Sequence, residues 1–218
     1  LRAHPPATSR SVGIRGLGKE GGISYICRNR NLNAIVMKKS FLFLADGFEE
    51  TEAIGTLDVL RRGGMEVQTV AVMGKQEVKG AHGVIIKADV LLREMLKEEG
   101  ELLIFPGGMP GAQNLSECGE LMGYLQEHFA RQGNVAAICA APALVLGKLP
   151  LKKDIRMTCY PGFENYLPEV NVLDKGVVVD GNVITGRGPG YSFAFGLAIV
   201  EHLCGKEKAD EVAAGMLL

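Results

Sequence analysis

The 218-residue sequence carries almost no net charge and lacks several motifs that mark common classes of function. Its formal net charge is −1 at pH 7, so charge gives no sign of a nucleic-acid partner. No apolar run reaches the roughly 20 residues that a membrane-spanning helix needs. Neither GxGxxG nor GxxxxGK[ST] occurs, which argues against a nucleotide site. We therefore expect no nucleic-acid partner and no membrane partner.

Cysteine pairs and suitably placed histidines are also missing. The five cysteines form no CxxC pair, and no Cys/His cluster has the spacing of zinc ligands. Free thiols in a reducing, cytoplasmic compartment are therefore expected, with no metal and no cofactor. A cysteine nucleophile ordinarily has a histidine base beside it, but the four histidines are each assigned a solvated or structural role. A conventional Cys-His hydrolase is poorly supported.

The first 36 residues differ in composition from the rest of the chain. Segment 1–36 has six basic residues against one glutamate, a net charge of +5, so the remainder carries about −6. It shows no apolar periodicity, whereas Met37 is followed at once by a strand-like run. We expect segment 1–36 to be a disordered leader or upstream sequence assigned in error, with a transit peptide as the alternative. The predicted single domain is then 37–218.

From Met37 onward, strand-like and helix-like segments alternate. Apolar β-prone runs are separated by segments with apolar residues at helical spacing. The expected strands are 40–45, 66–72, 101–105, 134–138 and 155–159, the hairpins 78–87 and 177–185, and the helices 50–62, 91–99, 115–132, 191–204 and 206–218. This alternation predicts an α/β fold, in which helices cover both faces of a mainly parallel sheet.

Cys139 is the leading candidate for chemistry. The apolar run 134–138 ends abruptly at this cysteine, and small residues and Pro142 lead into another apolar run. A strand–turn–helix of this kind lifts one side chain above the edge of the sheet. It also places the thiol at a helix N-terminus, where its pKa is expected to be lowered. Cys139 is thus predicted to be a nucleophile or an oxidation sensor, and the alternative is a buried structural cysteine.

Pro106–Gly108 and the acidic segment 46–52 also lie at expected carboxyl ends of strands, where ligands of parallel sheets bind. Glycines in Pro106–Gly108 can bring a backbone N–H close to a substrate oxygen and, with the N–H of Ala140, form an oxyanion hole. The alternative is an ordinary turn. The glycine-rich loop 186–190 opens a helix, and its Arg187 is predicted either to bind an anion or to be solvated. Pro189 of this loop is a further candidate for substrate binding.

The acidic segment 46–52 supplies the best partner for the cysteine. Glu49, Glu50 and Glu52 follow the first expected strand, and one or two of them can complement a helix dipole. Since all three cannot point the same way, one could project toward Cys139. A protonated glutamate would donate a hydrogen bond to a thiolate and hold it charged without any histidine. The two groups would then titrate as a pair.

With these residues assembled, the chain resembles the ThiJ/PfpI superfamily, in particular the branch of the parkinsonism-associated protein deglycase and its bacterial relatives. The matching segments are 45–53 (ADGFEETEA), 105–115 (FPGGMPGAQNL), 135–142 (VAAICAAP) and 185–190 (TGRGPG). The resemblance runs from about Lys38 to the C-terminus. It implies a flavodoxin-like three-layer sandwich, a homodimer, no cofactor, and a small reactive carbonyl compound as substrate.

The resemblance also implies roles for individual residues. Cys139 would be the reactive cysteine, Glu52 its hydrogen-bonding acid, and the backbones of Gly108 and Ala140 the oxyanion donors. Asp58 matches an acidic residue near the dimer interface of the family. One position departs from the pattern, because Tyr160 stands where some relatives have a histidine.

Tyr160 bears directly on the expected activity. A phenol with a pKa near 10 is a poor proton shuttle at neutral pH, so Glu52 would have to move the proton alone. Gly107 and Tyr160 are both counted among the residues expected to line the substrate site. Bacterial relatives also lack this histidine, so the resemblance still permits the activity.

Three hypotheses about function follow. The first is a cofactor-free glyoxalase or deglycase that acts on methylglyoxal-like 2-oxoaldehydes or their adducts through Cys139 and Glu52. The second is a redox sensor in which Cys139 is oxidised to a sulfinate with little turnover. The third is a holdase chaperone, which would depend on exposed apolar surface rather than on Cys139. The sequence does not separate the first two, because both need the same pair of groups.

Overall fold

The computed structural model describes residues 38–218, and the prediction for segment 1–36 lies outside these residues. The described part is built around a seven-stranded sheet with the order β10-β11-β7-β6-β1-β2-β5. Its strands are β1 (Ser40–Leu44), β2 (Val67–Ala71), β5 (Val90–Leu91), β6 (Leu102–Phe105), β7 (Asn134–Ile138), β10 (Val177–Asp180) and β11 (Val183–Gly186).

The sheet is parallel except at one edge. Strand β10 pairs antiparallel with β11, as the predicted hairpin requires, and every other pair in the sheet is parallel. Strands β1 and β6 are buried along their whole length. Continuous apolar burial is expected where helices cover both faces of a parallel sheet. The predicted α/β class is confirmed, and the order β2-β1-β6-β7-β11 is the 2-1-3-4-5 order of flavodoxin-like folds.

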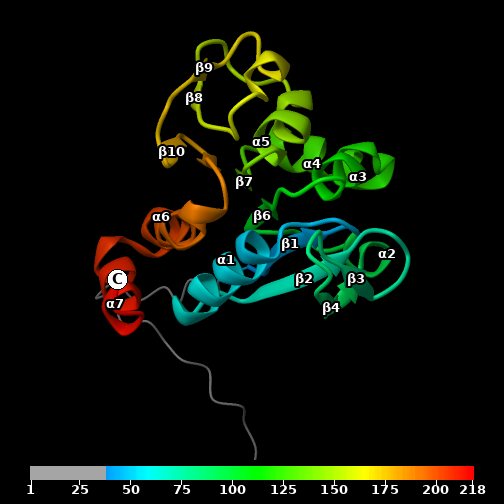
Figure 1. Cartoon of the computed structure of the whole chain (residues 1–218), viewed down its shortest axis with the longest axis horizontal. Coiled ribbons are helices and arrows are strands. Elements are labelled where there is room, and N and C mark those ends of the chain that lie inside the picture. Colours follow the sequence, from blue (N-terminus) through cyan, green and yellow to red (C-terminus); the bar gives the residue numbers. More distant parts are fainter. Residues whose placement is uncertain (1–37) are drawn as a thin grey trace, which may run out of the picture. The chain divides into compact units, whose positions relative to one another are not determined.

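Helices form the two outer layers. In Figure 1, α1 (Glu50–Arg62), α6 (Ser192–Cys204) and α7 (Lys206–Gly215) lie on one side of the sheet, and α1 packs against α6. On the other side lie α3 (Gly111–Glu117), α4 (Gly119–Ala130) and the short α5 (Ala141–Leu144). Among residues 38–218, no helix is long and apolar enough to cross a membrane.

Large apolar side chains fill the space between the layers. Phe43 on β1 stacks on Phe105 of the neighbouring β6, with ring centroids 5.2 Å apart and an interplanar angle of 14°. Both rings are fully buried. Burial of one such side chain stabilises the fold by roughly 1.5–3 kcal/mol. Because Phe43 and Phe105 lie close to the carboxyl ends of β1 and β6, this part of the core lies directly beneath those ends. It gives the residues at those ends a rigid base.

Smaller elements surround the sheet. The predicted hairpin 78–87 is confirmed as β3 (Glu77–Lys79) paired antiparallel with β4 (Ile85–Lys87). The expected strand 155–159 is shortened to β8 (Arg156–Met157), which pairs with β9 (Asn171–Val172) in a separate small sheet. The remaining short helices are α2 (Leu92–Met95), η1 (Leu146–Lys148), η2 (Glu164–Tyr166) and η3 (Pro189–Tyr191).

Two of the predicted helices were wrong in extent. The single helix expected over 115–132 is two helices, because Cys118 adopts an extended backbone (φ −75°, ψ 99°) between α3 and α4. Gly119 follows directly and starts the new helix. The expected helix 91–99 is reduced to α2, one turn long. Local apolar spacing does not reveal such a break, since both helices bury apolar residues on the same side of the sheet.

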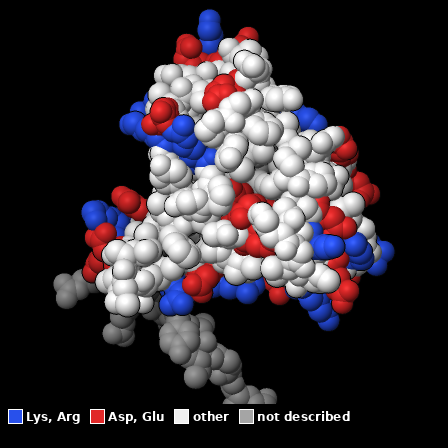
Figure 2. Space-filling model, viewed as in Figure 1, with Lys and Arg blue, Asp and Glu red and all other residues white. Residues whose placement is uncertain are grey.

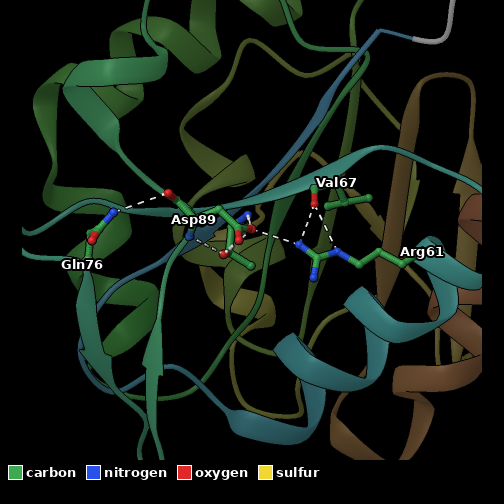
Figure 3. Close-up of polar contacts among 5 residues, drawn as sticks. Arg61, Val67, Gln76 and Asp89 are labelled. Atoms are coloured by element: carbon green, nitrogen blue, oxygen red, sulfur yellow. Dashed lines mark hydrogen bonds and ion pairs between the residues drawn. The ribbon is translucent and has the colours of Figure 1, made fainter. Parts of the chain in front are cut away.

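A polar cluster fastens α1 to the far edge of the sheet. The Arg61 guanidinium donates two hydrogen bonds to the carbonyl of Val67 and one to Asp89 Oδ2 (Figure 3). The same carboxylate oxygen accepts from the backbone N–H and the hydroxyl of Thr69, and Gln76 bonds the Asp89 carbonyl. The last turn of α1, β2 and the turn before β5 are therefore joined by one carboxylate.

Charged side chains are mixed over the surface. Figure 2 shows Lys, Arg, Asp and Glu residues interspersed on the face in view, with a largely uncharged area in the middle. This distribution agrees with the low net charge. A face with both signs interspersed gives no long-range field for steering a polyanion.

Candidate functional site

Cys139 occupies a sharp turn between β7 and α5. Its backbone lies in the left-handed region (φ +66°), which costs a non-glycine residue on the order of 1–3 kcal/mol. Two hydrogen bonds hold the turn: the Cys139 N–H donates to the Gly186 carbonyl (2.9 Å), and its own carbonyl accepts from the Tyr160 N–H (2.8 Å). The strained turn therefore rests on β11 and on the chain after β8. The residue is 8% exposed, so it is close to solvent without being open to it.

Glu52 meets this cysteine from the first turn of α1. Its side chain is almost completely buried, and its Oε2 accepts a hydrogen bond from the Gly107 N–H (2.8 Å). A Cβ atom added to Gly107 would lie 2.6 Å from Cys139 Cβ, 3.0 Å from Cys139 Sγ and 2.8 Å from Glu52 Oε2. Residues after β1, β6 and β7 thus converge on one point. Glu52 Oε1 is buried there with no hydrogen-bond partner.

The other two glutamates of the acidic segment have separate tasks. Glu49 caps α1, since its Oε2 accepts from the Glu52 N–H. Glu50 turns to the β3–β4 hairpin, where it accepts from the backbone N–H groups of His82 and Val84 and bonds the His82 ring at 2.8 Å. Only Glu52 is left to face the cysteine. The sequence left this choice open until the resemblance was considered.

The same contacts account for the one group of metal-ligand type in the described chain. One ligand atom each from Glu49, Glu50 and His82 lie within 4.8 Å of one another. Both oxygens of Glu50 already hold the hairpin, and Glu49 caps the helix. The group therefore has a structural explanation, and we assign no metal to it.

Burial dominates the electrostatics of the pair. It raises the pKa of Glu52 to about 7, and the hydrogen bond from Gly107 only partly offsets this. Burial, followed by the charge of Glu52, raises the pKa of Cys139 to about 12. Between these two values the pair holds one proton and one negative charge, and the two groups titrate together.

The expected lowering of the thiol pKa by a helix N-terminus is not what the structure gives. Helix α5 is only four residues long, so its dipole is small. The backbone N–H groups of Gly108 and Ala140 hydrogen-bond the sulfur and lower its pKa, but burial and Glu52 outweigh them. A charged sulfur is therefore favoured only in the form in which Glu52 carries the shared proton.

The glycine at 108 is required by the geometry. Its φ is +85°, and a Cβ atom there would lie 2.4 Å from the Glu49 nitrogen and 2.5 Å from the Gly47 carbonyl oxygen. The loop after β6 is therefore pressed against the loop after β1 with no room for a side chain. This contact aims the Gly108 N–H at the sulfur.

The remaining candidates lie around this centre. The Tyr160 ring is 45% exposed and lies 3.3 Å from where a Gly188 Cβ would be. Arg187 forms an ion pair with Asp174, which competes with the anion-binding role expected for it. Pro189 starts η3. In the described part of the chain, no hydrogen bond or ion pair joins Arg187 or Pro189 to Cys139 or Glu52.

Asp58, the candidate for the dimer interface, lies on the outer surface of α1. Its carboxylate is half exposed and pairs with Arg62 one turn later at 2.8 Å. The residue is thus accessible to a partner but is held by its own helix. Nothing in a single chain tests its predicted role.

Aromatic residues beside the site were missed by the sequence reasoning. Phe163 packs edge-on against Tyr160, with centroids 6.5 Å apart and an angle of 78°, and stacks on Tyr166 at 5.9 Å and 29°. The signal in the sequence 160–166 (YPGFENY) is that successive aromatic residues are three positions apart. No regular helix is expected over these residues, so this spacing alone does not predict that the rings touch.

A parallel sheet of flavodoxin-like order and a cysteine at a strained strand–helix turn together define a class: α/β proteins with a cysteine nucleophile elbow. The buried carboxyl beside the sulfur narrows that class. The chain belongs to the DJ-1/PfpI family, whose profile matches residues 38–202.

Individual relatives agree with this membership. The protein dj-1beta of Drosophila melanogaster is 40% identical over 185 residues, covering 83% of this chain and 97% of the relative. The glutathione-independent glyoxalase DJR-1.2 of Caenorhabditis elegans is 36% identical with the same coverage. Protein DJ-1 homolog A of Arabidopsis thaliana is 37% identical over 177 residues, and the chain spans only 45% of its length.

Solved structures show the same fold. The crystal structure of Drosophila DJ-1beta superposes with a TM-score of 0.79 at 37% identity, covering 84% of this chain and 99% of that one. A variant of the DJ-1 superfamily protein STM1931 from Salmonella typhimurium gives a TM-score of 0.79 at 35% identity, with 83% and 98% coverage. The predicted family and fold class are thereby confirmed.

Proposed function

We propose that the protein is a cofactor-free enzyme that converts small 2-oxoaldehydes such as methylglyoxal, or their adducts, to 2-hydroxy acids. The observation that carries the proposal is the buried Glu52 Oε1, which has no partner and belongs to a carboxyl beside the Cys139 sulfur. A carboxyl placed in this way can hold, give up and take back one proton. The family contains a relative named as a glyoxalase.

The first step is attack by the sulfur. Cys139 Sγ adds to the aldehyde carbon, a C–S bond forms, and the carbonyl electron pair moves to oxygen. In this proposal the N–H groups of Gly108 and Ala140, which hydrogen-bond the sulfur, also donate to that oxygen. Glu52 then gives its proton to the oxyanion and becomes a carboxylate, which leaves a hemithioacetal.

The second step moves a proton between two carbons. The Glu52 carboxylate removes the proton from the former aldehyde carbon and returns a proton to the adjacent carbon. The hydroxyl proton on the former aldehyde oxygen passes to the oxygen of that adjacent carbon, which gives a thioester of the 2-hydroxy acid. Water hydrolyses the thioester, releases lactate when the substrate is methylglyoxal, and restores the thiol. Glu52 acts without a histidine, because Tyr160 stands at the position where some relatives have one.

A second function is favoured by the same donors. Two molecules of peroxide would oxidise the Cys139 thiolate, first to a sulfenate and then to a sulfinate, and each step releases water. The N–H groups of Gly108 and Ala140 and the Glu52 carboxyl could bind the sulfinate oxygens. Oxidation with negligible turnover would favour this redox-sensing function.

We also propose a homodimer in the cytoplasm. Ile54 on α1 and Phe193 on α6 are 43% and 42% exposed, and Phe193 lies over Gly55 of α1. These residues and Asp58 share one outer surface, which a second copy of the chain could cover. Mass measurement by light scattering would test the dimer. Free thiols at Cys118, Cys139 and Cys159 support the compartment.

The decisive experiment compares the full chain with its Cys139→Ala variant. Methylglyoxal consumption and lactate formation are measured without glutathione. We expect turnover by the parent protein and none above the uncatalysed rate by the variant. Equal turnover by both, or none by either, contradicts the proposed enzyme. Mass spectrometry that finds peroxide oxidation confined to Cys139 would then support the redox sensor. Chaperone activity that survives Cys139→Ala would support the holdase.

A further inference from the structure

A cavity of about 470 Å³ lies next to the Cys139 site and has no part in the chemistry proposed above. Helices α3 and α5, the short helix η1 and the turn that contains η2 form its walls. Pockets for small ligands usually measure about 300–1,000 Å³. Methylglyoxal has five heavy atoms and would occupy a small part of this volume. The cavity therefore has room for a larger molecule, or for the larger part of one.

The cavity begins at the edge of the proposed reaction centre. Met109, in its wall, directly follows Gly108, and Ala143 and Leu144 belong to the helix that follows Cys139. The aromatic residues make a second connection. Tyr160, whose N–H bonds the Cys139 carbonyl, touches Phe163, and Phe163 and Tyr166 both line the cavity. A bound molecule would contact rings that adjoin the turn of Cys139.

The charges in the wall are one of each sign. Lys148 and Glu117 are the charged residues that line the cavity. The Lys148 ammonium donates one hydrogen bond to the carbonyl of Ser116, which precedes Glu117 in the sequence (2.6 Å), and has two further N–H groups. Glu117 accepts from Gln113 through Oε1 only. In the described chain neither residue forms an ion pair with another side chain, so both charges remain available to a ligand.

We propose that this cavity binds a zwitterionic α-amino acid or a dipeptide with an apolar, aromatic side chain. The ligand carboxylate pairs with Lys148, its ammonium group pairs with Glu117, and its side chain packs on Phe163 and Tyr166. Lys148 and Glu117 are both exposed to solvent, so neither needs a partner. One cation and one anion beside an aromatic wall suit such a ligand, because it can form a charge-assisted hydrogen bond with each. The role of the cavity in catalysis rests on the proposed function. There the cavity holds the amino-acid part of a carbonyl adduct, and Cys139 reacts with the carbonyl carbon of that adduct.

Binding is measured apart from any turnover. The Cys139→Ala protein is titrated with L-phenylalanine, L-phenylalanine amide and 3-phenylpropionate by calorimetry. The amide lacks the carboxylate and phenylpropionate lacks the ammonium group, and each is expected to bind roughly tenfold more weakly than the amino acid. No detectable binding of L-phenylalanine at millimolar concentration, or equal binding of all three, overturns the inference.

Variants place the ligand in the cavity. Lys148→Met and the isosteric Glu117→Gln should each weaken L-phenylalanine binding roughly tenfold, with an unchanged midpoint of thermal unfolding. Lys87→Met, on the exposed β4 strand, is the matched control and should keep the affinity of the parent. Unchanged affinity in both Lys148→Met and Glu117→Gln contradicts the assignment. If L-phenylalanine binds but methylglyoxal is not consumed by the parent protein, the binding site stands and the proposed enzyme fails.

Discussion

Two carboxylates in this protein show what different surroundings do to the same chemical group. Asp89, at the far edge of the sheet, has three donors on one oxygen, and these hydrogen bonds outweigh its burial, so the pKa lies below the usual range (Figure 3). Glu52 accepts from the Gly107 N–H, is hydrogen-bonded to Cys139, and has one buried oxygen without a partner. Burial raises its pKa to about 7. Asp89 is fixed in its charged form, whereas Glu52 can exchange a proton near neutral pH.

The comparison separates stability from reactivity. A carboxylate with full hydrogen bonding stabilises the fold and has little tendency to react. A buried carboxyl that lacks partners destabilises the fold in its charged form, and the surrounding core must compensate. Functional sites are where such costs are expected to gather, and here the strained backbone of Cys139 lies at the same point.

The largest expected effect separates the two carboxylates by turnover. Glu52→Gln keeps an acceptor for the Gly107 N–H but cannot transfer a proton, so methylglyoxal turnover should fall roughly 10²–10⁴-fold. Asp89→Asn, the matched control, should keep turnover close to that of the parent protein. Initial rates at saturating substrate give the comparison. Equal rates for Glu52→Gln and the parent would mean that Glu52 is not the proton carrier.

The next effect concerns how tightly the site is built. Gly108→Ala introduces positive-φ strain of roughly 1–2 kcal/mol and adds a clash with the loop after β1 that costs about 1–3 kcal/mol more. Gly64→Ala has nearly the same φ, +81°, but its Cβ meets nothing within 4 Å. Chemical denaturation should show the larger loss of stability for Gly108→Ala. Equal losses for the two variants would show that the contact between the loops is not tight.

Glu52 should also reveal itself in the pH dependence of stability. Its pKa is 4.5 in the unfolded reference and about 7 in the folded protein, so the folded state binds more protons between these values. The stability of the parent should therefore fall as pH rises from 4.5 to 7, by an amount on the order of 3 kcal/mol. Glu52→Gln removes this loss.

Thermal unfolding at two pH values checks the sign. At pH 8 the Glu52→Gln variant should melt at a higher temperature than the parent, and at pH 4.5 the two should melt alike. A variant that is less stable at pH 8 would place Glu52 among the stabilising carboxylates, with Asp89.

The sequence predicted much of this arrangement and missed parts of it for definable reasons. The strand before Cys139 and the helix from Glu50 to Arg62 were confirmed, because each is short, apolar on the expected side and bounded by clear turns. The break at Cys118 was missed because it leaves the apolar spacing unchanged.

The raised pKa of Cys139 could not be predicted from local sequence. It depends on burial beneath the loops after β1 and β6 and on the nearby Glu52, which lies 87 positions earlier in the chain. The N-terminus of a helix can be recognised in a sequence, but the length of that helix and the depth at which its first residues are buried cannot. The aromatic residues Phe163 and Tyr166 line a cavity whose other walls come from α3 and α5, which only the fold brings together.

The smallest expected effect concerns Asp89. Asp89→Asn loses charge-assisted hydrogen bonds to Thr69 and Arg61, and because its side chain is 44% exposed the cost should be only about 1 kcal/mol at pH 7. The folded pKa of Asp89 is lowered from 3.8, so its contribution is present above that value and disappears as pH falls through the folded pKa. Denaturation at pH 7 and near pH 3 should therefore show a cost that shrinks in acid.

Asp58→Asn is the control, since its single exposed pair with Arg62 is worth roughly 0.3–0.5 kcal/mol. A cost for Asp89→Asn no larger than that for Asp58→Asn would mean that the cluster in Figure 3 does not fasten α1 to the sheet, and the contrast between the two carboxylates would reduce to the burial of Glu52 alone.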